Sequence, residues 1–280
     1  MALLTLRAGD LEADVAPEAG MVCASLRHRG VELLGLRKGL DAYARTGSTM
    51  GVPMLYPWAN RIAARRFEVL GRTVDLDRAP DRFRTDGETG LPIHGVLAAG
   101  GAWAVEEQTE RSVRASFDWG ADEQLMAAFP FAHRVTLEIA LGEPARARWR
   151  VDVEGEAPVA FGFHPYLLAS ERSALDVPVH ERVVLDQRKL PTGERARATP
   201  ITGALGGRTF DDAYTAPTGP CRLDTLTLTF EEGFPYAQVF APPGEDLVSF
   251  EPMTAPANAL VTGEGLLRAP HTAAFSISVG

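Results

Sequence analysis

Hydrophobic and polar residues alternate with a period of two in several segments of the chain. In 112–119 the apolar residues Val, Ala, Phe and Trp share one face, and Ser, Arg and Asp share the other. The same alternation appears in 134–141 and 148–153 and, further along, in 226–230 and 275–279. Because successive side chains of a strand point to opposite faces, the pattern predicts strands with one buried and one solvated face. Such strands are typical of antiparallel sheets.

Turn residues and the scarcity of helical periodicity agree with this interpretation. Gly71-Arg72 is expected to join 67–70 to 73–76 in a short hairpin. Helical periodicity is confined to 121–128 and a turn near 256–260. Alternating β and α units, which a Rossmann fold or a TIM barrel requires, are missing.

These patterns predict an all-β fold, specifically one large antiparallel β-sandwich. The 27 glycines and 20 prolines are spread through all 280 residues, which suits many turns better than one flexible linker. We therefore expect a single domain over 1–280, in which the loop-rich stretch 186–220 is an insertion.

Charge and cysteine usage narrow the class of protein. With 28 basic and 37 acidic side chains the net charge is −9, which argues against a nucleic-acid partner. No apolar run approaches the roughly 20 residues of a membrane span, and the N-terminal segment lacks the basic lead-in of a signal peptide. Cys23 and Cys221 have neither a CxxC nor a zinc spacing, so we expect buried free thiols. The sequence predicts a cytoplasmic enzyme or binding protein that is a monomer or a homodimer.

Five short stretches combine polar groups with rigid or apolar neighbours. They are 56–62, 92–95, 161–166, 210–214 and 250–254. His164 follows the apolar strand predicted over 159–163, and its residue type fits a core histidine and a functional one equally well. Glu251 follows the strand predicted over 247–250, and Pro252 is expected to end that strand. A carboxylate behind Phe250 is costly to desolvate unless it is paired, which favours a functional role.

The other candidate residues are ambiguous one by one. Arg61 fits a surface ion pair, His94 a turn histidine, and Asp211 or Asp212 a turn cap. Taken with Asn60, His164 and Glu251, however, they supply an acid, a base, a charged clamp and several hydrogen-bonding groups. That combination indicates a site for a sugar.

In these stretches the chain resembles the aldose 1-epimerase (mutarotase) family, from about residue 45 to 260. Tyr56–Ile62 is similar to the family's aromatic-Pro-x-x-Asn-Arg-Ile segment, and His94-Gly95 to its His-Gly. His164 matches the catalytic histidine, Asp211 the sugar-binding aspartate and Glu251 the catalytic glutamate. The resemblance implies the family's galactose mutarotase-like supersandwich fold.

The chain also departs from the galactose-type members of that family. In those members Ser-Tyr-Phe comes directly after the histidine, and Thr-Gln comes directly after the glutamate. This chain has Pro165-Tyr166-Leu167 and Pro252-Met253 at these places. The acid–base pair is retained while groups that shape the sugar pocket differ. The identity of the sugar therefore stays open, whether a neutral, a phosphorylated or a sulfonated hexose.

The resemblance implies an isomerase that interconverts the α and β anomers of a hexose. Glu251 would act as base on the C1 hydroxyl, and His164 as acid on the ring oxygen. His94 and Arg61 would bind the ring-oxygen side, with Asp211 and Asn60 positioning the sugar. A nearby carboxylate is expected to keep His164 protonated near neutral pH. No cofactor is implied, because the glycine pairs lack a phosphate-binding context.

Three other interpretations remain at the level of sequence. His94, His164 and Glu251 are ligand types that zinc or iron would accept, although we expect no metal. Asp211 and Glu251 would suit a glycosidase. The leading alternative is a non-catalytic sugar-binding protein on the same scaffold, because a fold does not fix a function.

Overall fold

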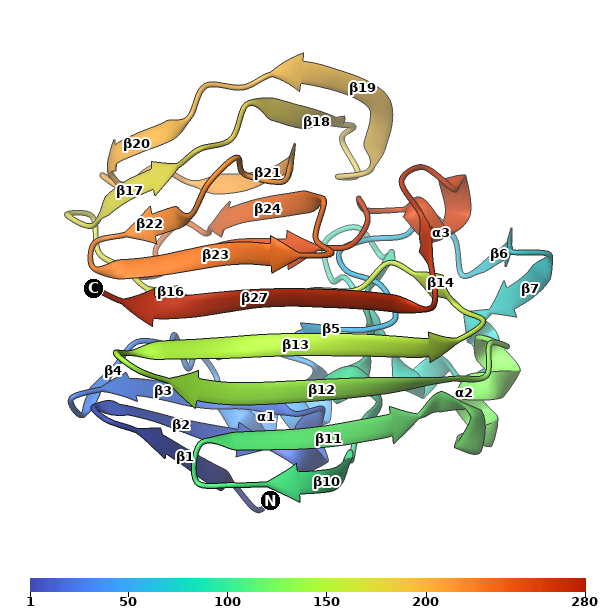
Figure 1. The fold of residues 1–280 in the computed structure, drawn as a ribbon. Helices are drawn as coiled ribbons and strands as arrows, with labels where there is room; N and C mark the ends of the chain where they lie inside the picture. The colour runs from blue at the N-terminus through green and yellow to red at the C-terminus, as the bar shows by residue number, and fades with distance from the viewer.

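The structure is a computed structural model that describes all residues from 1 to 280. Its largest sheet has nine antiparallel strands, and Figure 1 shows the long ones lying side by side across the front of the molecule. In spatial order they are β10 (Ala104–Gln108), β11 (Ser112–Asp118), β12 (His133–Gly142), β13 (Arg146–Gly155), β27 (His271–Val279), β23 (Leu226–Glu232), β22 (Cys221–Leu223), β17 (Ala174–Val177) and β20 (Ile201–Ala204).

A second antiparallel sheet has eight strands, and β5 of this sheet is seen behind β13 and β27 in Figure 1. Its path runs through β19 (Pro191–Arg197), β18 (Glu181–Leu185), β21 (Phe210–Thr215), β24 (Tyr236–Ala241), β25 (Leu247–Met253), β15 (Gly162–Phe163) and β5 (Met54–Leu55), and β16 (Leu167–Leu168) pairs with β25. The two large sheets confirm the predicted all-β, antiparallel class.

Smaller elements complete the fold. A four-stranded sheet consists of β1 (Leu4–Ala8), β2 (Leu11–Ala16), β3 (Val22–His28) and β4 (Val31–Glu32). Three two-stranded ladders pair β6 (Arg66–Val69) with β7 (Arg72–Asp75), β8 (Phe83–Thr85) with β9 (Pro92–Val96), and β14 (Pro158–Val159) with β26 (Leu267–Arg268). The α-helices are α1 (Leu40–Thr46), α2 (Glu123–Ala128) and α3 (Ala259–Thr262). None of the helices has the length and apolar character that a membrane span requires.

Several expectations about local structure are wrong. The stretch 186–220 is not a loop-rich insertion, because it contributes β19, β20 and β21 to the two large sheets. Its strands β19 and β20 lie at sheet edges with most residues exposed, so they have no apolar face to produce an alternating pattern. Helix α1 is missing from the prediction because only Tyr43 of its seven residues is buried. The β6–β7 turn is Leu70-Gly71 rather than Gly71-Arg72, and both of its residues have positive φ.

Pro252 was expected to end strand β25, but the strand continues past it to Met253. Ala237 of β24 lies opposite Pro252, and Tyr236 lies opposite Met253. Met253 also pairs with Gly162 of β15 on the other side. Pairing on both sides of residue 253 carries the strand past the proline, so Glu251 lies within the sheet.

Aromatic packing fixes β15 against the nine-stranded sheet. The ring of Phe163 lies 4.9 Å from that of Phe275 on β27, and Phe275 stacks on Trp149 of β13 at 4.9 Å with an interplanar angle of 6°. All three side chains are buried. Aromatic pairs of this kind add to the free energy gained by burying their area. The residue that follows Phe163, His164, is thereby held at a fixed place in the interior.

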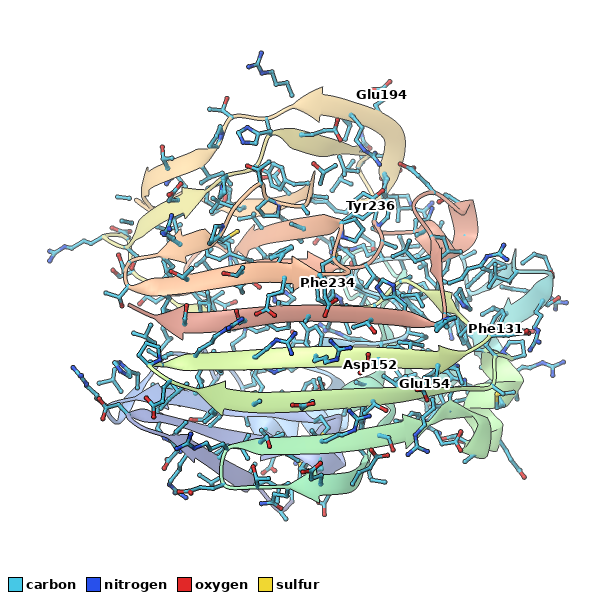
Figure 2. All side chains as sticks on the ribbon, in the orientation of Figure 1. Phe131, Asp152, Glu154, Glu194, Phe234 and Tyr236 are labelled. Carbon is cyan, nitrogen blue, oxygen red and sulfur yellow. The ribbon has the colours of Figure 1, made fainter.

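The outer face of the nine-stranded sheet is a layer of ion pairs. Arg148 contacts Glu231 at 2.7 Å, and Arg150 contacts Asp152 at 3.1 Å. Figure 2 shows Asp152 and Glu154 on the strand β13 that faces the viewer. Partly exposed pairs of this kind contribute little to stability, but they keep this face polar. The expected free cysteines, Cys23 and Cys221, are both buried and unpaired with each other, as predicted.

The segment that contains Asn60 and Arg61 is fastened to β9 by a close backbone contact. Tyr56 and Gly95 form a parallel bridge, and the Val96 amide donates to the Tyr56 carbonyl oxygen at 2.8 Å. Gly95 has φ +68°, and a Cβ at this position would lie 1.9 Å from the same oxygen. Only glycine fits this approach.

We expect Gly95→Ala to be strongly destabilising because it adds a steric clash to left-handed backbone strain. The matched control is Gly90→Ala, which has φ +69° and no atom within 4 Å of the added Cβ. The control should lose about 1 kcal/mol of unfolding free energy through backbone strain alone, and Gly95→Ala about 2 kcal/mol more through overpacking. Urea unfolding followed by tryptophan fluorescence measures both. Equal losses in the two variants would contradict the packing argument.

Candidate active site

A buried histidine and a buried carboxyl group meet between β15 and β25. His164 Nε2 lies 3.2 Å from Glu251 Oε1, and the two residues are 4% and 2% exposed. His164 follows β15, and its amide donates to the Pro53 carbonyl oxygen at 3.2 Å. Glu251 lies in β25 opposite Gln238 of β24. The structure therefore brings together two groups separated by 87 positions in the sequence.

Gly162 allows β15 and β25 to approach so closely. A Cβ on Gly162 would lie 2.7 Å from the Pro252 carbonyl oxygen and 3.0 Å from Ala59 Cβ. These neighbours flank Glu251 on one side and Asn60 on the other. A larger residue at 162 would push apart the segments that carry the site.

Several groups hold the His164 ring in place. Ser249 Oγ lies 3.0 Å from Nδ1, and the Tyr166 hydroxyl lies 3.2 Å from Nε2. The Tyr166 ring also stacks on the imidazole, with centroids 4.1 Å apart and an interplanar angle of 10°. The Tyr166 hydroxyl in turn contacts Thr49 Oγ1 at 2.5 Å and accepts from Arg37 Nη1 at 3.2 Å. The imidazole is thus oriented through both ring nitrogens and one face.

Asn60 and Arg61 form a rigid corner of the site. Asn60 has φ +59°, and its Oδ1 accepts from the Arg61 amide at 2.9 Å. Arg61 Nε donates to Asp86 Oδ2 at 2.9 Å, and this ion pair is largely buried. The Arg61 guanidinium and Thr89 bind the Asp86 carboxyl and lower its pKa to about 2 although burial opposes the shift. The turn at Asn258 closes the corner, because its amide donates to the Arg61 carbonyl oxygen at 2.8 Å.

The hydrogen bonds of His94 define its tautomer. The Asn60 amide donates to His94 Nδ1 at 3.1 Å, so Nδ1 is the acceptor and Nε2 carries the proton of the neutral ring. Burial lowers the pKa of His94 well below its usual value, and the cationic Arg84 adds to the shift. His94 is therefore a neutral side chain with one N–H left to donate.

Asp211 and Gln238 lie together on β21 and β24. Gln238 Nε2 donates to Asp211 Oδ1 at 2.7 Å, and Lys189 Nζ lies 3.3 Å from Asp211 Oδ2. Gln238 is 2% exposed, and its Oε1 has no hydrogen-bond partner in the protein. Asp212 pairs with Arg182 instead. Of the two aspartates that the sequence left open, Asp211 is the one at the site.

All six predicted site residues line one cavity of about 200 Å³. Its lining consists of Arg37, Thr49, Asn60, Arg61, Arg84, Asp86, Ile93, His94, His164, Tyr166, Asp211, Gln238, Phe240 and Glu251. A larger cavity of about 350 Å³, next to Arg72 and Phe131, contains no histidine and a single carboxyl group. Only the smaller cavity combines an acid–base pair with converging hydrogen-bond donors and acceptors. No group of three or more His, Cys, Asp or Glu side chains is arranged to hold a metal ion.

The structure favours another charge state of His164 than the sequence predicted. Burial lowers the pKa of His164 well below its usual value, and the charges of Arg37 and Arg84 lower it further. Burial raises the pKa of the Glu251 carboxyl well above its usual range, and the charge of Asp211 adds to this effect. Both shifts favour a neutral imidazole beside a neutral carboxyl group. The prediction that Glu251 keeps His164 protonated near neutral pH is wrong in direction, because burial and the charges of Arg37 and Arg84 lower the pKa of the imidazole.

Several cavity or supporting residues were missed in the sequence. Ser249 precedes Glu251 by two positions, so strand periodicity could have placed both on one face. Gln238 became recognisable only from the register of β24 with β25. Arg37, Thr49 and Arg84 come from irregular or short segments without a recognisable motif. Their contribution depends entirely on the tertiary fold.

Comparisons with known proteins identify the family and the fold of the chain. The family model described as aldose 1-epimerase matches residues 2–259. No curated protein matches the chain.

Solved structures share the whole fold at low sequence identity. A putative aldose 1-epimerase from Escherichia coli K12 is 18% identical, with a TM-score of 0.79 and coverage of 100% of this chain and 99% of that one. A galactose mutarotase-like protein from Clostridium acetobutylicum is 17% identical, with a TM-score of 0.81 and coverage of 99% and 94%. A galactose 1-epimerase from Lactobacillus acidophilus NCFM is 12% identical, with a TM-score of 0.73 and coverage of 98% and 92%. With a family model that spans nearly all of its residues, this chain belongs to the aldose 1-epimerase family.

Proposed function

We propose that this protein is an isomerase that interconverts the α and β anomers of an aldohexose or a hexose derivative. The observation that carries the proposal is the buried contact of 3.2 Å between His164 Nε2 and Glu251 Oε1 in a cavity of about 200 Å³. Anomerisation requires one group to remove a proton and another to supply one to the same sugar. A pair within hydrogen-bonding distance satisfies this need without a cofactor.

The reaction balances if His164 and Glu251 together hold one ionisable proton. Ring opening begins when the Glu251 carboxylate removes the C1 hydroxyl proton while the His164 imidazolium protonates the ring oxygen. The bond between C1 and the ring oxygen breaks, and C1 becomes an aldehyde. After rotation about the C1–C2 bond, the ring oxygen attacks the other face of C1 and both protons return.

The neutral pair favoured by burial is the arrangement that follows ring opening. Glu251 then carries the proton from the C1 hydroxyl, and His164 has lost its own. The arrangement that precedes ring opening differs only by transfer of one proton from Glu251 to His164 across their contact. The reaction therefore needs no proton exchange with solvent, which a largely buried site would slow.

Other cavity residues match the hydroxyl groups of a sugar. Neutral His94 has an Nε2 proton to donate, and Gln238 Oε1 is a buried acceptor without a partner. A buried polar atom left unpaired is costly, so a sugar hydroxyl at Gln238 would recover that free energy on binding. Arg61 and Asn60 supply fixed polar groups, and Asp211 accepts next to Gln238. A cytoplasmic location, as expected from the sequence, fits an enzyme of free sugars.

The first test is the effect of Glu251→Gln and His164→Asn on anomerisation. We would dissolve α-D-glucose and α-D-galactose separately and follow their interconversion by NMR. Because one positioned acid or base contributes about 10²–10⁴-fold, each variant should lose at least about 100-fold of the catalysed rate. The matched control is Glu154→Gln, which removes an exposed carboxylate on β13 and should leave the rate unchanged.

Outcomes of this test separate the proposal from its main alternative. Full activity in either variant, with the fold intact by circular dichroism, would remove that residue from the mechanism. Sugar binding without any acceleration by the unmodified protein would instead indicate a non-catalytic sugar-binding protein.

The second prediction concerns pH, because only the pair with one proton is active. Activity should fall as the pH drops through the lowered pKa of His164, when a second proton binds. It should also fall as the pH rises through the raised pKa of Glu251, when the shared proton leaves. We therefore expect the catalysed rate to stay level as the pH falls through 6.5, the ordinary value for an imidazole. NMR rates on both sides of this pH, after subtraction of the uncatalysed rate, measure the profile, and an acid limb centred at or above 6.5 contradicts it.

A further inference from the structure

Arg84 is a cavity residue whose charge the protein leaves unpaired. It lies in the middle of β8 and lines the same cavity as His94 and His164. Its Nη1 is buried and has no hydrogen-bond partner in the protein. No ion pair within 4.0 Å includes Arg84. A guanidinium stays charged under all ordinary conditions, so the cavity wall carries a cation that forms no ion pair of its own.

The other cations around the cavity already have partners. Arg61 is bound to Asp86 at 2.9 Å. Arg37 is held by both Glu245 oxygens, at 2.9 and 2.8 Å, and also donates to Tyr166. Lys189 at the rim pairs with Asp211 at 3.3 Å. The carboxyl groups near the cavity are thus engaged with Arg61, Arg37, Lys189 or His164, and none is left for Arg84.

A cation that has no ion pair and a buried nitrogen without a hydrogen-bond partner is unfavourable for folding. Breaking up a buried ion pair so that one charge remains alone is strongly destabilising, and unsatisfied buried groups are rare in folded proteins. A neutral sugar would offer Arg84 only hydroxyl groups and would leave the charge uncompensated. An anionic group on the ligand would supply both the missing charge and the acceptor for Nη1.

The size of the cavity limits what that anionic group can be. A volume of about 200 Å³ is below the roughly 300–1,000 Å³ typical of drug-sized ligands. The space within the site is therefore of the size of one monosaccharide with a small substituent.

We propose that the preferred substrate is a monosaccharide with a small acidic substituent, a carboxylate or a phosphate, that pairs with Arg84. The inference rests on the proposed anomerase function and specifies its substrate class. Two observations support it. The Arg84 guanidinium in the cavity wall has no partner, and every neighbouring cation and carboxyl group is already paired.

The test compares D-glucuronate, D-glucose 6-phosphate and D-glucose as substrates. We expect kcat/KM for at least one acidic sugar to exceed that for glucose by about tenfold or more, because a hydrogen bond to a charged group is worth roughly 1.5–3 kcal/mol. The two acidic sugars distinguish carboxylate from phosphate. In Arg84→Gln this preference should fall by roughly 10–100-fold, mainly through a higher KM for the acidic sugar. The matched control is Arg66→Gln at the exposed start of β6, which should keep the preference.

Thermal stability provides a readout that is independent of catalysis. Arg84→Met removes a charge that has no ion pair, together with its buried, unpartnered Nη1, and keeps an apolar stem, so the melting temperature without sugar should rise. An acidic sugar should raise the melting temperature of the unmodified protein and not that of Arg84→Met. An arginine that merely supports the fold would instead give a lower melting temperature in Arg84→Met.

The outcomes separate failure of this inference from failure of the proposed function. Equal kcat/KM for glucose and for both acidic sugars, unchanged in Arg84→Gln, would overturn the inference and leave the anomerase function standing. Binding of an acidic sugar that depends on Arg84, without faster anomerisation of any sugar, would support the inference and overturn the anomerase function.

Discussion

The contact between His164 and Glu251 holds two ionisable groups where neither is stable as an isolated charge. The surrounding structure serves to maintain that contact. Gly162 lets β15 approach β25, the packing of Phe163 on Phe275 fixes β15 to the nine-stranded sheet, and pairing beyond Pro252 keeps Glu251 inside a continuous strand. Separation of the two strands would leave each group to be buried alone. The fold is therefore tightly constrained at the place where the proposed chemistry lies.

The sequence was informative where a residue's role depends on residues close to it along the chain. Alternation predicted β11, β12 and β13 because each has one buried and one solvated face. Short stretches with rigid neighbours singled out His164 and Glu251, and the resemblance to a known family ordered them into one site. The strands that lack a buried face, β19 and β20, gave no such signal, and the region around them was interpreted as loop.

The sequence was least informative where a role depends on the distance between segments. Arg84 has the same local sequence as many surface arginines, and only the fold shows that its Nη1 is buried without a partner. Gln238 becomes significant through its position opposite Glu251. The charge of His164 was predicted wrongly for a related reason. Proximity to a carboxyl group was foreseeable, but the extent of burial that reverses its effect on the pKa was not.

Several departures from ideal structure lie at the cavity, although others are spread over the molecule. Asn60 and His94 have positive φ although neither is glycine. Two of the four buried side-chain atoms without a partner, Arg84 Nη1 and Gln238 Oε1, line the cavity, while the other two are indole nitrogens of Trp58 and Trp149. Strain and unmet hydrogen bonds reduce folding stability, and proteins tend to retain them where a ligand offsets the loss. One unmet group is an acceptor and the other a cation, so the ligand that satisfies both has a hydroxyl group and a negative charge.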